Sequence, residues 1–167
     1  MAYRNKVYIA FDGDKDIHYY RLLIAWAKNK NLDFTLHDAH DISSARDTST
    51  EETIKRRLKE RFNGSKAFIL LVGESTKYLY KFVRWEIETA IKLGLPIIVV
   101  NLNKKRSRDD LRCPAIVRDE LATHVSFEMK IINYAVDNWP ASHKRYLASG
   151  DTGAYYYKNT QYSALGL

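Results

Sequence analysis

The segment between residues 66 and 102 constrains the fold most, because two apolar runs enclose an amphipathic stretch there. The first run is Ala67–Val72 and ends at Gly73, and the second is Ile97–Val100, which follows a Gly-Leu-Pro sequence. Short apolar runs rich in β-branched residues and bounded by Gly or Pro are typical of strands buried on both faces of a parallel sheet. Between the runs, apolar residues recur at helical spacing: Val83, Ile87, Ala90 and Ile91. The segment therefore predicts a βαβ unit whose helix crosses the sheet.

Strand-like and helix-like patterns alternate along the rest of the chain. Further strands are predicted near residues 6–11, 34–37 and 124–127, and further helices near 17–30, 50–62 and 131–139. This alternation predicts an open, mostly parallel α/β sheet of about five strands with helices on both faces. At 167 residues the chain suits one domain. We assign residues 1–139 to it, since Pro140 is expected to end the last helix, and 140–167 to a tyrosine-rich tail that packs on the domain or forms an interface.

Charge and composition restrict the partners of the protein. The net charge is +7, with 46% hydrophobic and 28% charged residues, which is ordinary for a globular protein but attractive to anions. The basic clusters at 55–61 and 104–108 are not interleaved with aromatic residues, so nucleic-acid binding is not expected. No apolar run approaches the length of a membrane span, and the single Cys113 cannot form an internal disulfide. These features favour a cytoplasmic protein without a membrane partner.

Several common kinds of site lack their sequence signature. There is no glycine-rich dinucleotide fingerprint, no phosphate-binding Walker loop and no nucleophile elbow, so hydride transfer, NTP hydrolysis and serine hydrolysis are not expected. The histidines lack the spacing of a metal site, although His37 and His40 beside Asp38 and Asp41 leave a cation site open. A receiver domain would carry its phospho-accepting Asp at the end of the third strand, where Gly73 stands. No cofactor or metal is predicted.

The candidate site residues follow the predicted strands or lie on the next helix. Ligands of open parallel sheets bind beyond the carboxyl ends of the strands, which places Phe11 and Asp12 after the first strand and Asp38 after the second at the expected edge. On the helix after the third strand, Phe82 and Glu86 are four residues apart and share a face at the rim of the apolar stripe. Because glutamates at such a rim are commonly solvated, periodicity alone leaves the role of Glu86 open.

Three short motifs carry a resemblance to a known family. They are the run Phe82–Glu86 with Trp85 inside it, the opening strand 7–11 followed by Asp12 and Asp16, and Asp38-Ala39 after the second strand. Together they resemble the TIR family, and more closely the ThsB-like proteins of bacterial Thoeris antiphage systems, over roughly residues 5 to 135. In TIR enzymes a tryptophan, three residues and then the catalytic glutamate occupy this helix, and Phe82 replaces that tryptophan here. The resemblance implies a flavodoxin-like fold.

The resemblance also implies an activity and a set of roles. It implies an enzyme that cleaves NAD, releases nicotinamide and makes a cyclic ADP-ribose-like signal, with Glu86 catalytic. NAD would be a substrate rather than a cofactor, and the partners implied are a second copy of the chain and a separate effector reached through the diffusible nucleotide. A carboxylate suits this chemistry because positive charge builds on the ribose as the bond breaks. The substrate-binding residues expected around it are Phe11, Asp12, Asp38, Phe82 and Trp85, of which the two aspartates have turn capping as an alternative role.

Two other functions remain open from the sequence. One is a non-catalytic TIR-like adaptor that acts by self-association or partner docking, which the Phe82 replacement and the tyrosine-rich tail favour. The other is a basic α/β domain that binds nucleotides or nucleic acid without cleaving them. Loss of NAD in the presence of the purified protein would exclude the adaptor.

Overall fold

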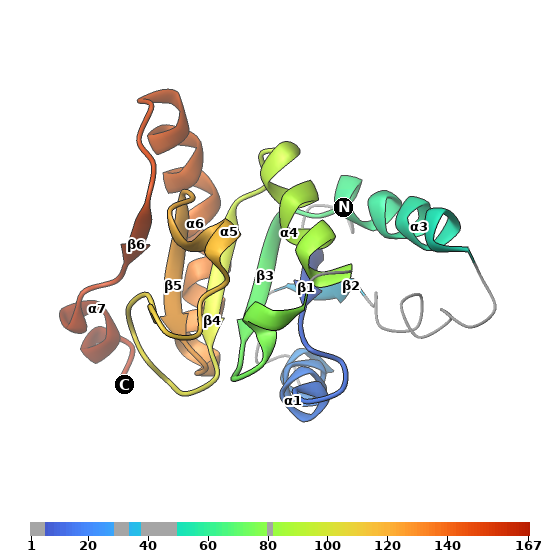
Figure 1. Ribbon diagram of the computed structural model, residues 1–167. Coiled ribbons are helices and arrows are strands. Elements are labelled where there is room, and N and C mark those ends of the chain that lie inside the picture. Colours follow the sequence, from blue (N-terminus) through green and yellow to red (C-terminus); the bar gives the residue numbers. More distant parts are fainter. Residues whose placement is uncertain (1–5, 29–33, 38–49, 80–81) are drawn as a thin grey trace.

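A computed structural model describes residues 6–28, 34–37, 50–79 and 82–167, which form one six-stranded sheet (Figure 1). Every pair of neighbouring strands is parallel, and the strand order is β2-β1-β3-β4-β5-β6. The strands are β1 (Lys6–Ala10), β2 (Thr35–His37), β3 (Ala67–Val72), β4 (Ile97–Asn101), β5 (Ala122–Ser126) and β6 (Ala154–Tyr156). The chain reverses its direction of travel across the sheet between β1 and β3, because β2 lies on the other side of β1.

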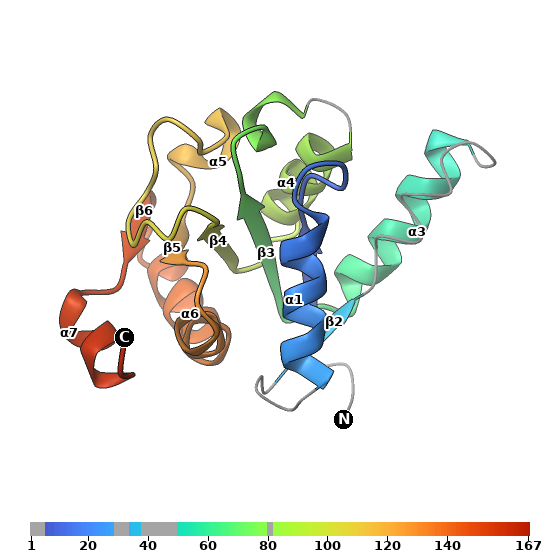
Figure 2. The same ribbon diagram turned by 90° about the horizontal axis from the view of Figure 1, so that it is seen from below.

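Helices cover both faces of the sheet (Figures 1 and 2). The helices are α1 (Ile17–Lys28), α3 (Glu51–Asn63), α4 (Phe82–Lys92), α5 (Ala115–Arg118), α6 (Met129–Ala148) and α7 (Asn159–Ala164), with a short 3₁₀ helix, η3, at Thr76–Tyr78. One hydrophobic cluster joins the sheet to α1 and α6, and a second joins it to α3, α4 and α5. Alternate residues of β1 enter different clusters, since Ile9 faces α1 whereas Tyr8 faces α3 and α4.

The predicted α/β class is confirmed, with one correction to the strand number. The third strand has the bounds Ala67–Val72 that its apolar run predicts, and all of its residues are buried. The sheet has six strands rather than about five, and all of them are parallel. The additional strand is β6, which lies in the tyrosine-rich tail and pairs with β5 through only three residues. A strand this short at a sheet edge lacks the fully apolar run that marks β3 and β4.

The prediction that Pro140 ends the last helix is wrong, because α6 continues through it to Ala148. A proline inside a helix removes one backbone hydrogen bond and costs roughly 3 kcal/mol. On both sides of it the helix buries side chains against the sheet, including Trp139 and His143. Tyr146 then stacks on Tyr155 of β6, with ring centroids 4.5 Å apart. Burial on both sides of the proline thus compensates the missing hydrogen bond.

The residues after α6 pack on the domain. Tyr162 of α7 is fully buried, and its hydroxyl accepts a hydrogen bond of 3.2 Å from the backbone N–H of Ser126 at the end of β5. The guanidinium of Arg106 lies over the same ring, 4.1 Å from its centroid. The described helices include none with the length and apolarity needed to cross a membrane.

Candidate active site

Glu86 lies on α4, one helical turn after Phe82, and its side chain is buried, with 7% of its surface exposed. The phenolic oxygen of Tyr8, in the middle of β1, donates a hydrogen bond of 2.5 Å to Oε2 of Glu86. Tyr8 is fully buried and comes from a position 78 residues earlier in the chain. The interpretation of Glu86 as a solvated rim residue is therefore wrong, because the fold holds its carboxylate between the sheet and α4.

Tyr8 is held as a hydrogen-bond donor by its surroundings. Burial raises the pKa of its hydroxyl well above the usual value, and the neighbouring charge of Glu86 raises it further. The hydroxyl consequently keeps its proton at neutral pH. Its ring stacks against two others, with centroids 4.0 Å from Phe62 and 5.7 Å from Phe68. Aromatic packing holds the Tyr8 ring in place, and the hydrogen bond from its hydroxyl in turn orients the carboxylate of Glu86.

The two aromatic residues predicted beside Glu86 have different surroundings. Phe82 is buried in the hydrophobic cluster under α3 and α4 that also contains Tyr8. Trp85 is half-buried and packs toward α3, where its ring meets the edge of Phe62 with centroids 6.1 Å apart. Nζ of Lys55 lies 5.6 Å from the centroid of the same indole. The structure thus assigns Trp85 a contact between α3 and α4 next to the carboxylate.

Of the two site residues predicted after β1, Phe11 lies apart from the group around Glu86, and Asp12 stabilises the loop between β1 and α1. Phe11 stacks on Tyr20 of α1, with centroids 4.5 Å apart, and belongs to the cluster on the sheet face opposite to Tyr8. Asp12 is buried, and its Oδ1 accepts hydrogen bonds from the backbone N–H groups of Asp14 at 3.0 Å and Lys15 at 3.2 Å. Turn capping, one of the two roles considered for Asp12, is therefore present. Asp38 lies outside the described residues.

Metal ligation finds no support in the residues that the structure describes, which contain no group of three or more His, Cys, Asp or Glu side chains able to hold an ion. The cation site left open at His37 and His40, beside Asp38 and Asp41, lies outside them except for the backbone of His37 in β2. What the arrangement around Glu86 offers is one oriented carboxylate in apolar surroundings. Such a group can stabilise positive charge that develops beside it, since the low local dielectric strengthens the interaction.

Sequence reasoning missed Tyr8, which the structure makes the hydrogen-bond partner of Glu86. Its strand runs Val7-Tyr8-Ile9-Ala10, so the phenol is the one polar side-chain group in an otherwise apolar run. A buried hydroxyl needs a partner, and this requirement was the available signal. The sequence could not predict which residue would be that partner, because this depends on how α4 crosses the sheet.

The parallel sheet reverses its strand order beside β1, which defines a flavodoxin-like α/β domain, and the helix after β3 carries the buried Glu86. The family model described as the Thoeris protein ThsB, TIR-like domain, matches residues 8–107, which is more than half of the 167 residues. The chain therefore belongs to the ThsB TIR-like family. The matched range includes both Tyr8 and Glu86.

Proposed function

We propose that this protein is a NAD-cleaving enzyme of a Thoeris antiphage defence system, with Glu86 as its catalytic residue. The observation that carries the proposal is the buried carboxylate of Glu86 with its hydrogen bond to Tyr8, inside the range that matches the ThsB TIR-like family. A glutamate is costly to bury, so an oriented and buried one on this helix calls for a role beyond solubility.

The reaction begins with cleavage of the bond between C1′ of the ribose and the nicotinamide nitrogen. The electron pair of that bond leaves with nicotinamide, which departs neutral and needs no acid, and positive charge remains on the ribose. Glu86 stabilises this charge and orients the ribose by contacts with the ribose hydroxyls. A nucleophilic N–H or O–H group of the ADP-ribose portion then bonds to C1′, loses its proton to water and closes a cyclic product.

Tyr8 and Phe82 would assist without taking part in bond breaking. The hydroxyl of Tyr8 donates to Oε2 of Glu86 and so holds the carboxylate in one orientation. Phe82, one turn earlier on α4, supplies an apolar wall where TIR enzymes carry a tryptophan. An apolar wall excludes water and so strengthens the attraction between the carboxylate and the developing charge.

The proposal is tested by incubating the purified protein with NAD and following NAD, nicotinamide and ADP-ribose products by mass spectrometry. Glu86→Gln keeps the size of the side chain but removes its charge, and should reduce turnover about a hundredfold, the equivalent of about 3 kcal/mol. Glu88→Gln is the matched control, because Glu88 is exposed and pairs with Arg84 at 3.0 Å on another side of α4. Equal turnover in both variants and the wild type would contradict the assignment.

A non-catalytic adaptor is the second candidate, and one structural observation favours it. Tyr156 lies on the edge strand β6 with 62% of its surface exposed, in a position suited to docking another chain. Intact NAD after prolonged incubation, together with a complex that Tyr156→Glu dissolves, would favour the adaptor over the enzyme.

A further inference from the structure

A second candidate site lies beyond the carboxyl ends of β1, β3 and β4. A cleft of about 270 Å³ opens there, lined by the start of α1, by residues 73–75 after β3 and by residues after β4. This is the place where the strand order reverses, beside β1, and open parallel sheets bind ligands at such a point. Glu86 is not among the residues that line the cleft, so the cleft is distinct from the site around that carboxylate.

The floor of the cleft holds a buried carboxylate without a partner. Asp16 has 7% of its surface exposed, and its Oδ2 finds no hydrogen-bond partner in the described part of the chain. The carboxylate lies against Gly73, where a Cβ atom would stand 2.4 Å from Oδ2. Leaving a buried polar group unsatisfied costs roughly 1–3 kcal/mol, so a hydrogen-bond donor that enters the cleft and reaches this carboxylate would be favoured.

The rim of the cleft carries basic groups. Lys15, His18 and Arg112 all line it, and His18 and Arg112 are close enough to Asp16 to oppose the rise in its pKa that burial and Asp12 cause. Nη2 of Arg112 lies 3.4 Å from Oε1 of Glu74, an exposed ion pair that a bound anion could replace at little cost. At the start of α1, the backbone N–H groups of Ile17 and His18 find no acceptor among the described residues. Free N–H groups at a helix start favour an anion.

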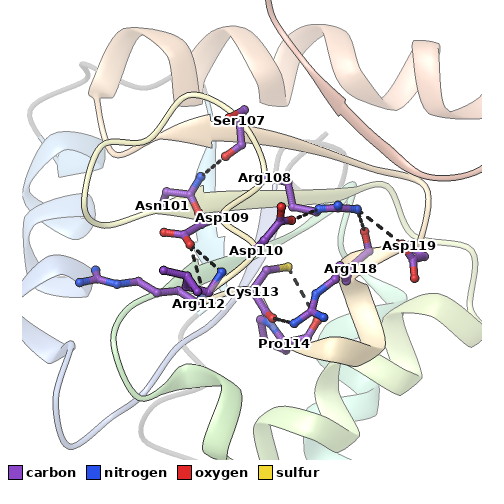
Figure 3. Close-up of polar contacts among 11 residues, drawn as sticks. Asn101, Ser107, Arg108, Asp109, Asp110, Arg112, Cys113, Pro114, Arg118 and Asp119 are labelled. Atoms are coloured by element: carbon purple, nitrogen blue, oxygen red, sulfur yellow. Dashed lines mark hydrogen bonds and ion pairs between the residues drawn. The ribbon is translucent and has the colours of Figure 1, made fainter.

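Hydrogen bonds within residues 101–112, which begin at the end of β4, hold the backbone of Arg112 in place (Figure 3). Nδ2 of Asn101, the last residue of β4, donates to the carbonyl oxygens of Lys105 at 2.9 Å and Ser107 at 2.8 Å. Oδ1 of Asp109 accepts the backbone N–H of Arg112 at 3.2 Å. The side chain of Arg112 extends away from this cluster in Figure 3, and it reaches the cleft.

We propose that the cleft binds a small phosphorylated polyol, with its hydroxyls bonded to Asp16 and its phosphate held by Arg112, Lys15 and the first N–H groups of α1. Hydroxyl donors suit Asp16 better than an ammonium group, because the cations Lys15 and Arg112 already line the same cleft and the net charge is +7. The phosphate has to lie at the rim, away from the carboxylate, which requires a ligand with two chemically different ends. A volume of about 270 Å³ is at the small end for ligand sites, so a sugar monophosphate fits and a dinucleotide does not.

The proposal is tested by titration calorimetry of the whole protein with ribose 5-phosphate and with its two halves, ribose and inorganic phosphate. Ribose 5-phosphate should bind saturably and about tenfold or more tightly than either half, because it engages both ends of the cleft. No saturable heat up to about 10 mM ribose 5-phosphate would overturn the site. Equal affinity for inorganic phosphate, or tighter binding of phosphoethanolamine, would overturn the role of Asp16 as acceptor for hydroxyls.

Variants separate the two ends of the cleft. Asp16→Asn and Arg112→Gln should each weaken ribose 5-phosphate about tenfold, while only Arg112→Gln should weaken inorganic phosphate. Arg84→Gln is the matched control, since Arg84 also forms an exposed ion pair but lies outside the cleft, and it should bind like the wild type. Unchanged affinity in both cleft variants would overturn the proposal, and if Asp16→Asn does not fold, Arg112→Gln against Arg84→Gln decides alone. These readouts need no NAD turnover, so they stand or fall independently of the catalytic role of Glu86.

Discussion

At the scale of single residues, the hydroxyl of Tyr8 and the carboxylate of Glu86 form the polar contact on which the candidate site depends. The pair joins β1 to α4 inside a hydrophobic cluster. Removing one partner of such a buried pair deprives the other of a hydrogen bond, which costs more than the pair itself contributes. The contact therefore contributes to stability, and under the proposed function it would contribute to activity as well.

Tyr8→Phe should lower both stability and NAD turnover. The ring and its stacking remain, but Glu86 loses the hydrogen bond from Tyr8, so we expect the free energy of unfolding to fall by about 1–3 kcal/mol. Turnover should fall by less than in Glu86→Gln, because the charge is still present and only its orientation is lost. Urea denaturation and an NAD assay measure the two effects. Tyr78→Phe, at an exposed tyrosine, is the control, and a Tyr8→Phe protein as stable as the control would show that the contact contributes nothing.

His124 should make the fold sensitive to acid. Burial lowers its pKa to about 4, with a further decrease from Arg108, and both ring nitrogens lack partners within the described residues. The unfolded chain binds the proton with an ordinary pKa near 6.5, so stability is full above that pH and is lost as the pH falls toward 4. The loss should approach about 3 kcal/mol. Urea denaturation of His124→Gln between these pH values should show a smaller loss than the wild type. The same acid dependence in both proteins would assign it to other groups, such as His143, whose pKa burial also lowers.

At the scale of elements, local patterns predicted the central strands well and the C-terminal elements poorly. The apolar runs of β3 and β4 consist of residues that are consecutive in the chain, so a local pattern is enough to predict these strands. The passage of α6 through Pro140 depends instead on contacts with β6, which lies later in the chain. The candidate site divides in the same way: Glu86 follows from a local motif, whereas its partner Tyr8 is 78 positions away and becomes apparent only once the sheet is assembled.

Pro140→Ala should stabilise the protein, because alanine restores the backbone donor inside α6 and removes the clash of the ring with the preceding turn. We expect a gain of about 1–2 kcal/mol, less than the full helix penalty of proline because the unfolded chain also gains freedom. Thermal denaturation measures the change, and Ala141→Gly, at the next and exposed position, should lower stability by about 1 kcal/mol as a check on helical structure there. A loss of stability in Pro140→Ala would show that packing around α6 needs the distortion that proline imposes.

At the scale of the whole molecule, assembly is the property that the family resemblance implies and that a single chain does not display. Both edges of the sheet are short strands, β2 and β6, of three residues each. We expect NAD turnover per molecule to rise with protein concentration if a second copy completes the site. Turnover measured over a hundredfold dilution series, alongside sedimentation velocity, tests this, and a constant specific activity would indicate a self-sufficient monomer.

The close approach of Gly73 to Asp16 has a consequence for how the family can vary. A side chain at position 73 would begin 2.4 Å from an oxygen of Asp16, so the carboxylate would have to leave its place. A change at position 73 therefore affects position 16, although the two lie in different loops. We expect relatives that keep an acid at the first position to keep glycine at the second, and relatives that gain a larger residue at the second to have lost the acid. Paired substitution at these two sites would thus distinguish, from sequences alone, the members that retain the cleft from those that have filled it.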